Sequence, residues 1–379
     1  MKILYISQSS HLYGSGKALY NIIVGMHQKQ GVRVFVVLPN DEGALYKALL
    51  QIGIAPIIIP IPSSVYPTLG TQRDRVAFFY RLFRIIRHSK KAYYALKKVV
   101  KDINPNIIHT NVGVIHTGYS VAKRMKIPHV WHIREFQDLH FGWTPIPSNQ
   151  SFKKKLHSEG NYCVSISKAL YQHYELGLNA SVIYDGVFDE MNIPKITNSK
   201  QNYFLYVGNI SEGKGVREAV NGFKTFSKNN PGYEFWLAGE GAMMPWLKEQ
   251  ANEMPAIKAL NYRNDINQLM QGAIALIVPS RFEGFGFILV EAMLNHCIVI
   301  GHDVAGIKEQ FDNGKELTGD EIGLRYKGGQ ELVTMMRYVV ERSKDLAEMS
   351  ERAYKTVLSL YSIQKDTDEL IGLYNRLLK

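Results

Sequence analysis

The stretch VPSRFEGFGFILVEAM, residues 278–293, carries the main structural signal of this sequence. It follows a β-rich run and continues into an apolar helical pattern, so it predicts a strand end, a glycine-containing loop and a helix. Gly284 and Gly286 permit a sharp turn, after which the amides of Phe285, Gly286 and Phe287 point outward at the helix start. Free N–H groups and the helix dipole favour an anion there, and we expect a diphosphate.

Two glutamates accompany this loop. Glu283 stands just before the expected anion site, and Glu291 lies about two turns into the helix, on roughly the same side as the helix start. Carboxylates beside an anion site repel phosphate, so we expect them to accept hydrogen bonds from sugar and ribose hydroxyls. The alternative is a pair of surface acids, which are favoured near a helix start in any case.

Strand-like and helix-like segments alternate along the chain in two successive series. The first series runs from KILYIS at 2–7 to NYCVSIS at 161–167, and the second starts with NYFLYVGNI at 202–210. Such alternation predicts parallel sheets with helices on both faces, and 379 residues exceed the usual size of one core. We therefore expect an α/β fold of two Rossmann-like, doubly wound lobes whose strand ends face an interdomain cleft. The predicted divisions are residues 1–195, residues 196–360, and a C-terminal helix at 361–379 that packs back toward the first lobe.

Composition narrows the class of protein. Cys163 and Cys297 lie far apart and form no paired motif, which disfavours disulfides and cysteine zinc sites and fits a cytoplasmic location. No apolar run reaches the length of a membrane span, and the opening MKILYIS lacks the pattern of a signal peptide. The formal net charge of +11 indicates an anionic partner.

Two other nucleotide-binding classes fit the sequence poorly. GSGK at 14–17 is not an ATPase phosphate loop, because that motif needs glycine where His11 stands and serine or threonine where Ala18 stands. A dinucleotide dehydrogenase is disfavoured as well, because no acid follows the expected second strand, VRVFVVLPN at 32–40.

Taken in order, the motifs resemble the large family of retaining GT-B glycosyltransferases with an E-x7-E motif, here Glu283 and Glu291. The resemblance covers nearly the whole chain. Besides 278–293, it rests on Gly14–Gly16, WHIREF at 131–136, VSISKAL at 164–170, IYDGV at 183–187, VGNISEGKG at 207–215, LAGEG at 237–241, NYRNDI at 261–266 and DVAGIKEQ at 303–310.

The resemblance implies an acceptor-binding first lobe and a donor-binding second lobe. In the second lobe Glu291 would bind the ribose hydroxyls and Glu283 the transferred sugar. Lys214 would neutralise the diphosphate, and Tyr262 and Arg263 would lie near the base. For Lys214 the alternative is a solvated loop lysine, because SEGKG also suits an ordinary turn.

Further positions follow from the same resemblance. Gly16 would let the backbone approach the phosphates, and His132 would lie beside the reacting carbon, unless it is a packed core histidine. The chain departs from the family at Asn209, where arginine is usual, which leaves the diphosphate short of one positive charge. Arg281 or Arg217 compensates, or donor affinity is weak.

The function implied is a hexosyltransferase that moves a sugar from a nucleotide-diphosphate donor, UDP- or GDP-linked, to an acceptor hydroxyl. The anomeric configuration would be retained, and the product would belong to a cell-envelope polysaccharide or glycolipid. We expect no metal and no cofactor, because no convincing DxD-like cluster is present. The alternatives are a catalytically attenuated sugar-nucleotide-binding protein, in view of Asn209, and a GT-B sugar-nucleotide epimerase.

The segment 73–101 concentrates the positive charge, with ten basic residues against one acid. As a helix from Arg73 to Ile103 it presents a basic face and an apolar face, the pattern of helices that lie in a lipid interface. We expect an anionic membrane surface and a lipid-linked acceptor as partners, a peripheral position on the cytoplasmic side, and no nucleic acid. The alternative is that the apolar face packs on the first sheet. The basic face comprises Arg84, Arg87, Lys91 and Lys98, and the apolar face comprises Val76, Phe79, Tyr80, Phe83 and Ile86.

Overall fold

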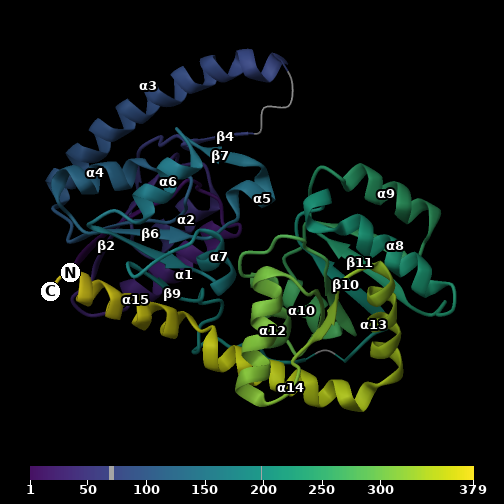
Figure 1. Cartoon of the computed structure of the whole chain (residues 1–379). Helices are drawn as coiled ribbons and strands as arrows, with labels where there is room; N and C mark the ends of the chain where they lie inside the picture. Colours follow the sequence, from purple (N-terminus) through teal and green to yellow (C-terminus); the bar gives the residue numbers. More distant parts are fainter. Residues whose placement is uncertain (68–71, 198) are drawn as a thin grey trace. The chain divides into compact units, whose positions relative to one another are not determined.

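The computed structural model describes residues 1–67, 72–197 and 199–379, and gives only the backbone for residues 72–76, 140, 343 and 344 (Figure 1). The chain forms two compact units: unit 1 consists of residues 1–186 and 363–379, and unit 2 of residues 187–362. Each is a parallel α/β unit, as the alternating pattern predicted.

Unit 1 is built on a seven-stranded parallel sheet with the order β3-β2-β1-β5-β6-β8-β9. Short apolar runs form its strands, and buried aliphatic side chains cover both faces, which is typical of parallel sheets. The strands are β1 (Lys2–Ile6), β2 (Arg33–Leu38), β3 (Ile57–Ile58), β5 (Ile107–Thr110), β6 (His129–Ile133), β8 (Asn161–Ser165) and β9 (Ala180–Val182), and β4 (Val65–Pro67) pairs with β7 (Trp143–Pro145) in a separate antiparallel ribbon. The helices are α1 (Ser15–His27), α2 (Ala44–Gln51), α3 (Gln72–Ile103), α4 (Thr117–Met125), α5 (Gln137–Phe141), α6 (Asn149–Leu156), α7 (Lys168–His173) and α15 (Ile363–Leu377).

Unit 2 contains a six-stranded parallel sheet with the order β12-β11-β10-β13-β14-β15. The strand order reverses between β10 and β13, and in unit 1 it reverses between β1 and β5. Ligands of doubly wound sheets bind at such reversal points, outside the carboxyl ends of the strands. The strands are β10 (Tyr203–Val207), β11 (Glu234–Ala238), β12 (Ile257–Asn261), β13 (Ala275–Val278), β14 (Ile298–His302) and β15 (Leu324–Tyr326). The helices are η1 (Glu212–Lys214), α8 (Val216–Ser227), α9 (Met244–Glu253), α10 (Ile266–Gly272), α11 (Phe287–Leu294), α12 (Ala305–Thr318), α13 (Gly329–Glu341) and α14 (Ser343–Leu360).

The division between the units falls after residue 186, whereas the sequence predicted residue 195. The N–H of Val187 bonds the carbonyl of Tyr361 at 2.8 Å, and Phe188 forms a bridge with Ser362. These backbone contacts attach the start of the connecting segment to the end of α14. The polar stretch at 195–202 marked a loop inside unit 2 and not the boundary itself.

Helix α15 packs on α1 in unit 1, where the two helices lie side by side in Figure 1. A Cβ on Gly25 of α1 would lie 2.0 Å from Thr367 Oγ1, so the glycine allows this close approach. Asp366 accepts the N–H of Gly186 at 3.0 Å, and burial raises the pKa of its carboxyl to about 8. The carboxyl therefore stays protonated at neutral pH.

Helix α3 carries two apolar stretches with different environments. Ala92, Leu96 and Val100 are buried in the core of unit 1. The earlier apolar residues are exposed, with fractions of 73% for Phe79 and 63% for Phe83, so the alternative in which this face packs on the sheet is wrong for these residues. Tyr80 and Ile86 share this exposure, and the side chains of Arg73, Arg75 and Val76 lie outside the described residues.

None of the described helices has the length and apolarity needed to cross a bilayer.

Candidate active site

Two loops meet at the reversal point of the unit 2 sheet. Gly215 ends the loop after β10 with a φ of +71°, and a Cβ at this position would lie 2.1 Å from the carbonyl oxygen of Pro279, in the loop after β13. Only glycine accommodates both the left-handed backbone and this approach. The loops that carry Lys214 and Glu283 are thereby held backbone against backbone.

Lys214 and Glu283, both predicted site residues, form an ion pair across these loops. The Lys214 Nζ donates to Glu283 Oε2 at 2.8 Å, and the two side chains are 25% and 19% exposed. Because Glu283 already neutralises part of the Lys214 charge, Lys214 attracts a diphosphate less strongly than an unpaired lysine would. A diphosphate bound at this loop would therefore share the N–H groups of Lys214 with Glu283.

The start of α11 is fixed from the neighbouring helix α12. Gly286 caps α11 with a φ of +90°, and Gln310 Nε2 donates to the carbonyl of Phe285 and, at 3.3 Å, to that of Gly286. The N–H of Gly306 bonds the carbonyl of Glu283 at 2.9 Å. These contacts fix the loop that precedes α11, a helix whose first N–H groups lack intrahelical acceptors. Gly306 and Gln310 were not among the predicted site residues, although their motif DVAGIKEQ repeats the strand, loop and helix pattern.

The other donor-lobe candidates are distributed around these loops. The ring of Phe285 is buried and packs on Tyr361 at 5.3 Å, so its side chain is structural. Phe287 and Glu291 are half-buried on α11. After β12, Tyr262 is 57% exposed, while Arg263 forms a bidentate pair with Asp265 at 2.8 and 2.5 Å, which lowers the pKa of that acid.

Asn209 is exposed at the end of β10, and the cations expected to compensate for it both face carboxylates. Arg217 Nε lies 3.1 Å from Glu212 Oε2, and its guanidinium covers the ring of Trp246 at 4.6 Å. Arg281 is 62% exposed and lies 3.9 Å from Glu218. Arg281 is thus the less constrained of the two.

Gly16 lies in unit 1 at the start of α1, where its own loop encloses it. A Cβ there would lie 2.0 Å from the carbonyl oxygen of His11, and the N–H of Gly16 bonds the carbonyl of Tyr13 at 2.9 Å. Local packing therefore requires this glycine. Its predicted approach to a phosphate stays a prediction.

His132 is fully buried on β6, and its neighbours determine which nitrogen carries the proton. Its Nδ1 lies 3.1 Å from Arg134 Nη2, which only donates, so Nδ1 accepts. His109 Nε2 lies 3.2 Å from the same Nδ1, and because that Nδ1 is an acceptor, His109 Nε2 donates to it. The other ring nitrogen of His109, Nδ1, then accepts from Tyr374 OH at 2.6 Å. Tyr374 OH in turn lies 3.0 Å from Tyr5 OH. The proton of His132 sits on Nε2, a buried atom without a partner among the described residues.

Burial, with the charge of Arg134 as a smaller contribution, holds the pKa of His132 well below its ordinary value. The imidazole is therefore neutral, and its Nε2–H is a hydrogen-bond donor. The Nδ1 of His132 is not placed to take a proton from a substrate, because His109 and Arg134 already donate hydrogen bonds to it. His132 is a packed histidine that nevertheless keeps one free donor.

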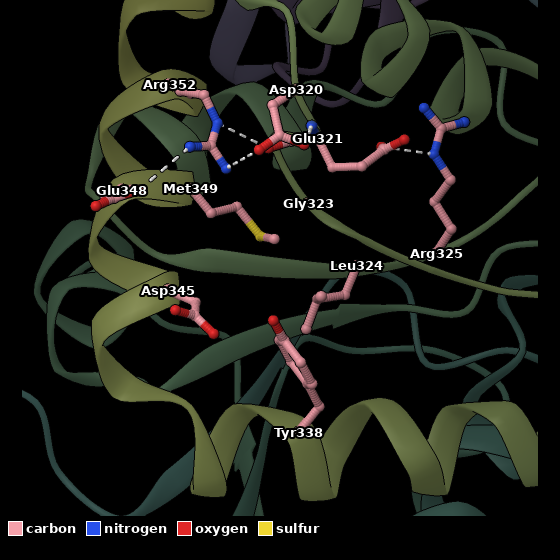
Figure 2. A pocket seen from close by; sticks show the side chains of 10 residues that line it. All are labelled: Asp320, Glu321, Gly323, Leu324, Arg325, Tyr338, Asp345, Glu348, Met349 and Arg352. Atoms are coloured by element: carbon pink, nitrogen blue, oxygen red, sulfur yellow. Dashed lines mark hydrogen bonds and ion pairs between the residues drawn. The ribbon is translucent and has the colours of Figure 1, made fainter.

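A separate hollow of unit 2 lies between β15 and helices α13 and α14 (Figure 2). Figure 2 shows Arg352 reaching Asp320, at 3.2 Å, and Arg325 reaching Glu321, at 3.0 Å. None of the predicted site residues lines this hollow, and its arginines are engaged in ion pairs. We regard it as a structural ion-pair network.

Comparisons with known proteins agree with this architecture. HepE of Anabaena in complex with UDP superimposes with a TM-score of 0.77 over 99% of this chain and 100% of that chain, at 18% identity. Sucrose-phosphate synthase of Thermosynechococcus elongatus gives a TM-score of 0.71 over 100% and 99%, at 15% identity. The fold is that of the GT-B glycosyltransferases.

The family match falls on unit 2, where residues 188–356 fit the model of "Glycosyl transferases group 1". The chain is 23% identical over 249 residues to glycogen synthase of Mycobacterium tuberculosis, and the match spans 59% of this chain and 59% of that enzyme. It is 24% identical over 388 residues to UDP-Gal:alpha-D-GlcNAc-diphosphoundecaprenol alpha-1,3-galactosyltransferase of Escherichia coli, covering 92% of each. Residues 188–356, nearly all of unit 2, thus match a group 1 glycosyltransferase domain, and the chain spans about three fifths of the length of glycogen synthase.

The contact between Gly215 and Pro279 yields a direct test. We expect Gly215→Ala to weaken UDP or GDP binding about tenfold or more and to destabilise unit 2 by roughly 1–3 kcal/mol, because the Cβ collides and the left-handed backbone is strained. Calorimetry and denaturant unfolding measure the two effects. Gly213→Ala is the matched control, since no atom lies within 4 Å of its Cβ position. Equal behaviour of the two variants would contradict the assigned contact.

Proposed function

We propose that this protein transfers a sugar from a UDP- or GDP-linked donor, bound by unit 2, to an acceptor hydroxyl with retention of the anomeric configuration. The observation that carries the proposal is the Lys214–Glu283 pair beside the start of α11, at the reversal point of the sheet. This arrangement supplies a cation, helix amides and a carboxylate within one group of loops. A nucleotide diphosphate linked to a sugar needs all three.

In this proposal the donor's diphosphate lies at the α11 amides and Lys214, Glu291 accepts the ribose hydroxyls and Glu283 a hydroxyl of the sugar. The bond between the anomeric carbon and the diphosphate oxygen breaks, and the acceptor oxygen bonds to that carbon on the same face. The acceptor's proton goes to the departing phosphate. Catalysis then consists of positioning and of stabilising the charge of the leaving group.

His132 has a limited part in this chemistry. Its neutral ring offers only the Nε2–H, so it serves as a hydrogen-bond donor to a sugar oxygen and not as the proton acceptor. Within the described residues no three His, Cys, Asp or Glu side chains gather as a metal site requires. That neither a metal nor a cofactor takes part stays a prediction.

The two glutamates test the donor assignment. We expect Glu291→Ala to weaken donor binding about tenfold or more through lost ribose hydrogen bonds, and Glu283→Gln mainly to lower the single-turnover rate. Calorimetry and rapid-quench kinetics separate these effects, with Glu316→Gln, an exposed acid on α12, as the control. Wild-type affinity and rate in both variants would defeat the assignment. Normal donor binding by the wild type without turnover would instead favour an attenuated binding protein.

For the acceptor we propose a lipid-linked saccharide at the cytoplasmic face of a membrane, used in envelope polysaccharide or glycolipid synthesis. One support is that the Escherichia coli relative acts, by its name, on a diphosphoundecaprenol-linked sugar. The other is helix α3, whose exposed Phe79, Tyr80, Phe83 and Ile86 accompany a row of exposed arginines and lysines. Aromatic and basic side chains on one helix are suited to an anionic lipid interface.

The membrane proposal is tested with lipid vesicles. Each cation near an anionic leaflet contributes about 1 kcal/mol, so we expect the protein to sediment with anionic vesicles at low salt and to be released as salt rises. Replacing Arg84, Arg87, Lys90 and Lys91 by Gln should abolish sedimentation and spare donor binding. A control that replaces four exposed lysines elsewhere, Lys47, Lys228, Lys248 and Lys355, should still sediment. Equal partition onto neutral and anionic vesicles, or none onto either, would point to a soluble acceptor.

A further inference from the structure

A hollow of unit 1 is lined by residues of α4 and α6 and by one residue of α3, the helix that packs on α4 (Figure 1). Its volume is about 750 Å³, within the range of about 300–1,000 Å³ that is usual for ligand sites. None of the predicted site residues lines this hollow, and its whole lining belongs to unit 1. A ligand bound here would therefore occupy a site other than the donor site proposed in unit 2.

The lining of this hollow is strongly basic. Five of its side chains are cations, and within the described part of the chain no aspartate or glutamate belongs to the lining. Like charges gathered around one hollow repel one another, and a bound anion relieves that repulsion. The cations are Lys123, Arg124 and Lys126 at the end of α4, and Lys154 and Lys155 at the end of α6.

These five cations also lack the partners that cations have elsewhere in the chain. None of them forms an ion pair with another described residue. By contrast, Lys153 on the same helix α6 pairs with Glu175 at 2.7 Å, and Lys214 of unit 2 pairs with Glu283 at 2.8 Å. An unpaired cation keeps its whole charge for an incoming anion.

Lys155 is the one half-buried cation of the five. Its Nζ donates to His116 Nδ1 at 3.2 Å, and burial, together with the charge of Lys155, lowers the pKa of His116 to about 3. The imidazole is therefore neutral and supplies no countercharge. Burial also lowers the pKa of Lys155, and an anion bound beside the ammonium would stabilise its charged form.

An ordinary explanation exists for basic residues at these positions. Cations in the last turn of a helix complement the helix dipole, and both α4 and α6 end in this way. That effect accounts for each helix separately. It does not account for two basic ends that share one hollow without an acid, or for a half-buried lysine that faces a neutral ring.

A phosphate group suits this lining better than other anions do. The hydroxyls of Ser120 and Ser158 already donate to backbone carbonyls, at 3.0 and 2.8 Å, so a ligand meets mainly the N–H groups of the cations. Lysine binds phosphate as a point charge, and arginine donates two parallel hydrogen bonds to it. A phosphomonoester carries a charge of about −1.5 to −2 at neutral pH, so it engages several cations at once, as a carboxylate does not.

A nucleobase finds no platform in this hollow. The ring of Tyr119 is buried and stacks on Trp131 with 5.5 Å between the ring centroids. Lys123 Nζ lies 5.8 Å from the centroid of the Tyr119 ring. The phosphate group, and not a base, is therefore the part of a ligand that this hollow recognises.

We propose that this hollow is an anion site of unit 1, distinct from the donor site, in which Lys123, Lys154 and Lys155 bind a phosphomonoester or diphosphate group. The site goes beyond the proposed transferase function and does not depend on it. The phosphate belongs either to a phospholipid headgroup or to a water-soluble compound, because both present the same oxygens to the cations.

The experiment titrates the full chain with pyrophosphate in a calorimeter, with saturating UDP and GDP present to fill the proposed donor site. We expect one pyrophosphate per chain, and an affinity lowered about tenfold or more in the double variant Lys123→Gln/Lys154→Gln, because two charged contacts are lost. The control Lys47→Gln/Lys153→Gln removes the same charge outside the hollow and should bind as the wild type does. Absence of binding by the wild type, or equal affinity in the two double variants, overturns the proposal.

Two further measurements keep the outcomes separate. Because Lys123→Gln/Lys154→Gln relieves repulsion, this variant should unfold at the same or a higher temperature than the wild type. A clear loss of stability would assign these lysines to the fold and overturn the proposal. UDP and GDP titrations without pyrophosphate test the donor site: their failure counts against the proposed function, and the hollow is still tested by its own variants.

Vesicles distinguish the two sources of phosphate. They consist of phosphatidylcholine with or without phosphatidic acid, and the protein carries the four Gln replacements of α3, so that this helix does not mask the hollow. Binding to the phosphatidic acid vesicles that is lost when Lys123→Gln and Lys154→Gln are added identifies a lipid headgroup. Pyrophosphate binding without vesicle binding identifies a water-soluble phosphate compound. Either result upholds the site.

Discussion

The approach of Gly215 to the carbonyl of Pro279 is the constraint on which the candidate active site of unit 2 depends. It holds the loop after β10 against the loop after β13, at the point where the strand order of the sheet reverses. The Lys214–Glu283 pair spans the same two loops, and α12 fixes the second of them through Gly306 and Gln310. In the proposed function, the amides and the cation for the phosphates and the carboxylate for the sugar therefore lie on loops that this backbone contact holds together.

Much of the fold followed from the sequence because parallel strands are short apolar runs and their helices begin after glycine-containing loops. The reversal-point loops of unit 2 were predicted for the same reason. The pairing of Lys214 with Glu283 was not predicted, because it depends on the contact between two loops that lie far apart in the sequence. The boundary at residue 186 escaped prediction because it rests on the backbone bonds of Val187 and Phe188 to the end of α14, which leave no local pattern.

Buried polar groups were the hardest features to predict. His132 was selected from its motif, but the direction of its free N–H depends on Arg134, His109 and, through His109, on Tyr374 from the far end of the chain. The burial of Gln137, with no partner for either amide atom among the described residues, likewise leaves no signal in the sequence, since a glutamine at a helix start is ordinary. The apolar row of α3 was visible in the sequence because its residues recur three or four positions apart, but that spacing left open whether the row packs on the sheet, and its exposure is seen only in the structure.

In the proposed function, groups of the protein alone hold the donor's diphosphate at the reversal point of unit 2. Calorimetric titration of UDP and GDP in the presence of EDTA, with UMP and GMP for comparison, tests it most directly. We predict that one of the diphosphates binds at one site per chain, and that its monophosphate binds about tenfold more weakly or worse, because the second phosphate meets Lys214 and the α11 amides. Equal affinity for mono- and diphosphate, or binding that appears only after a divalent metal is added, would contradict a diphosphate site made by the protein alone.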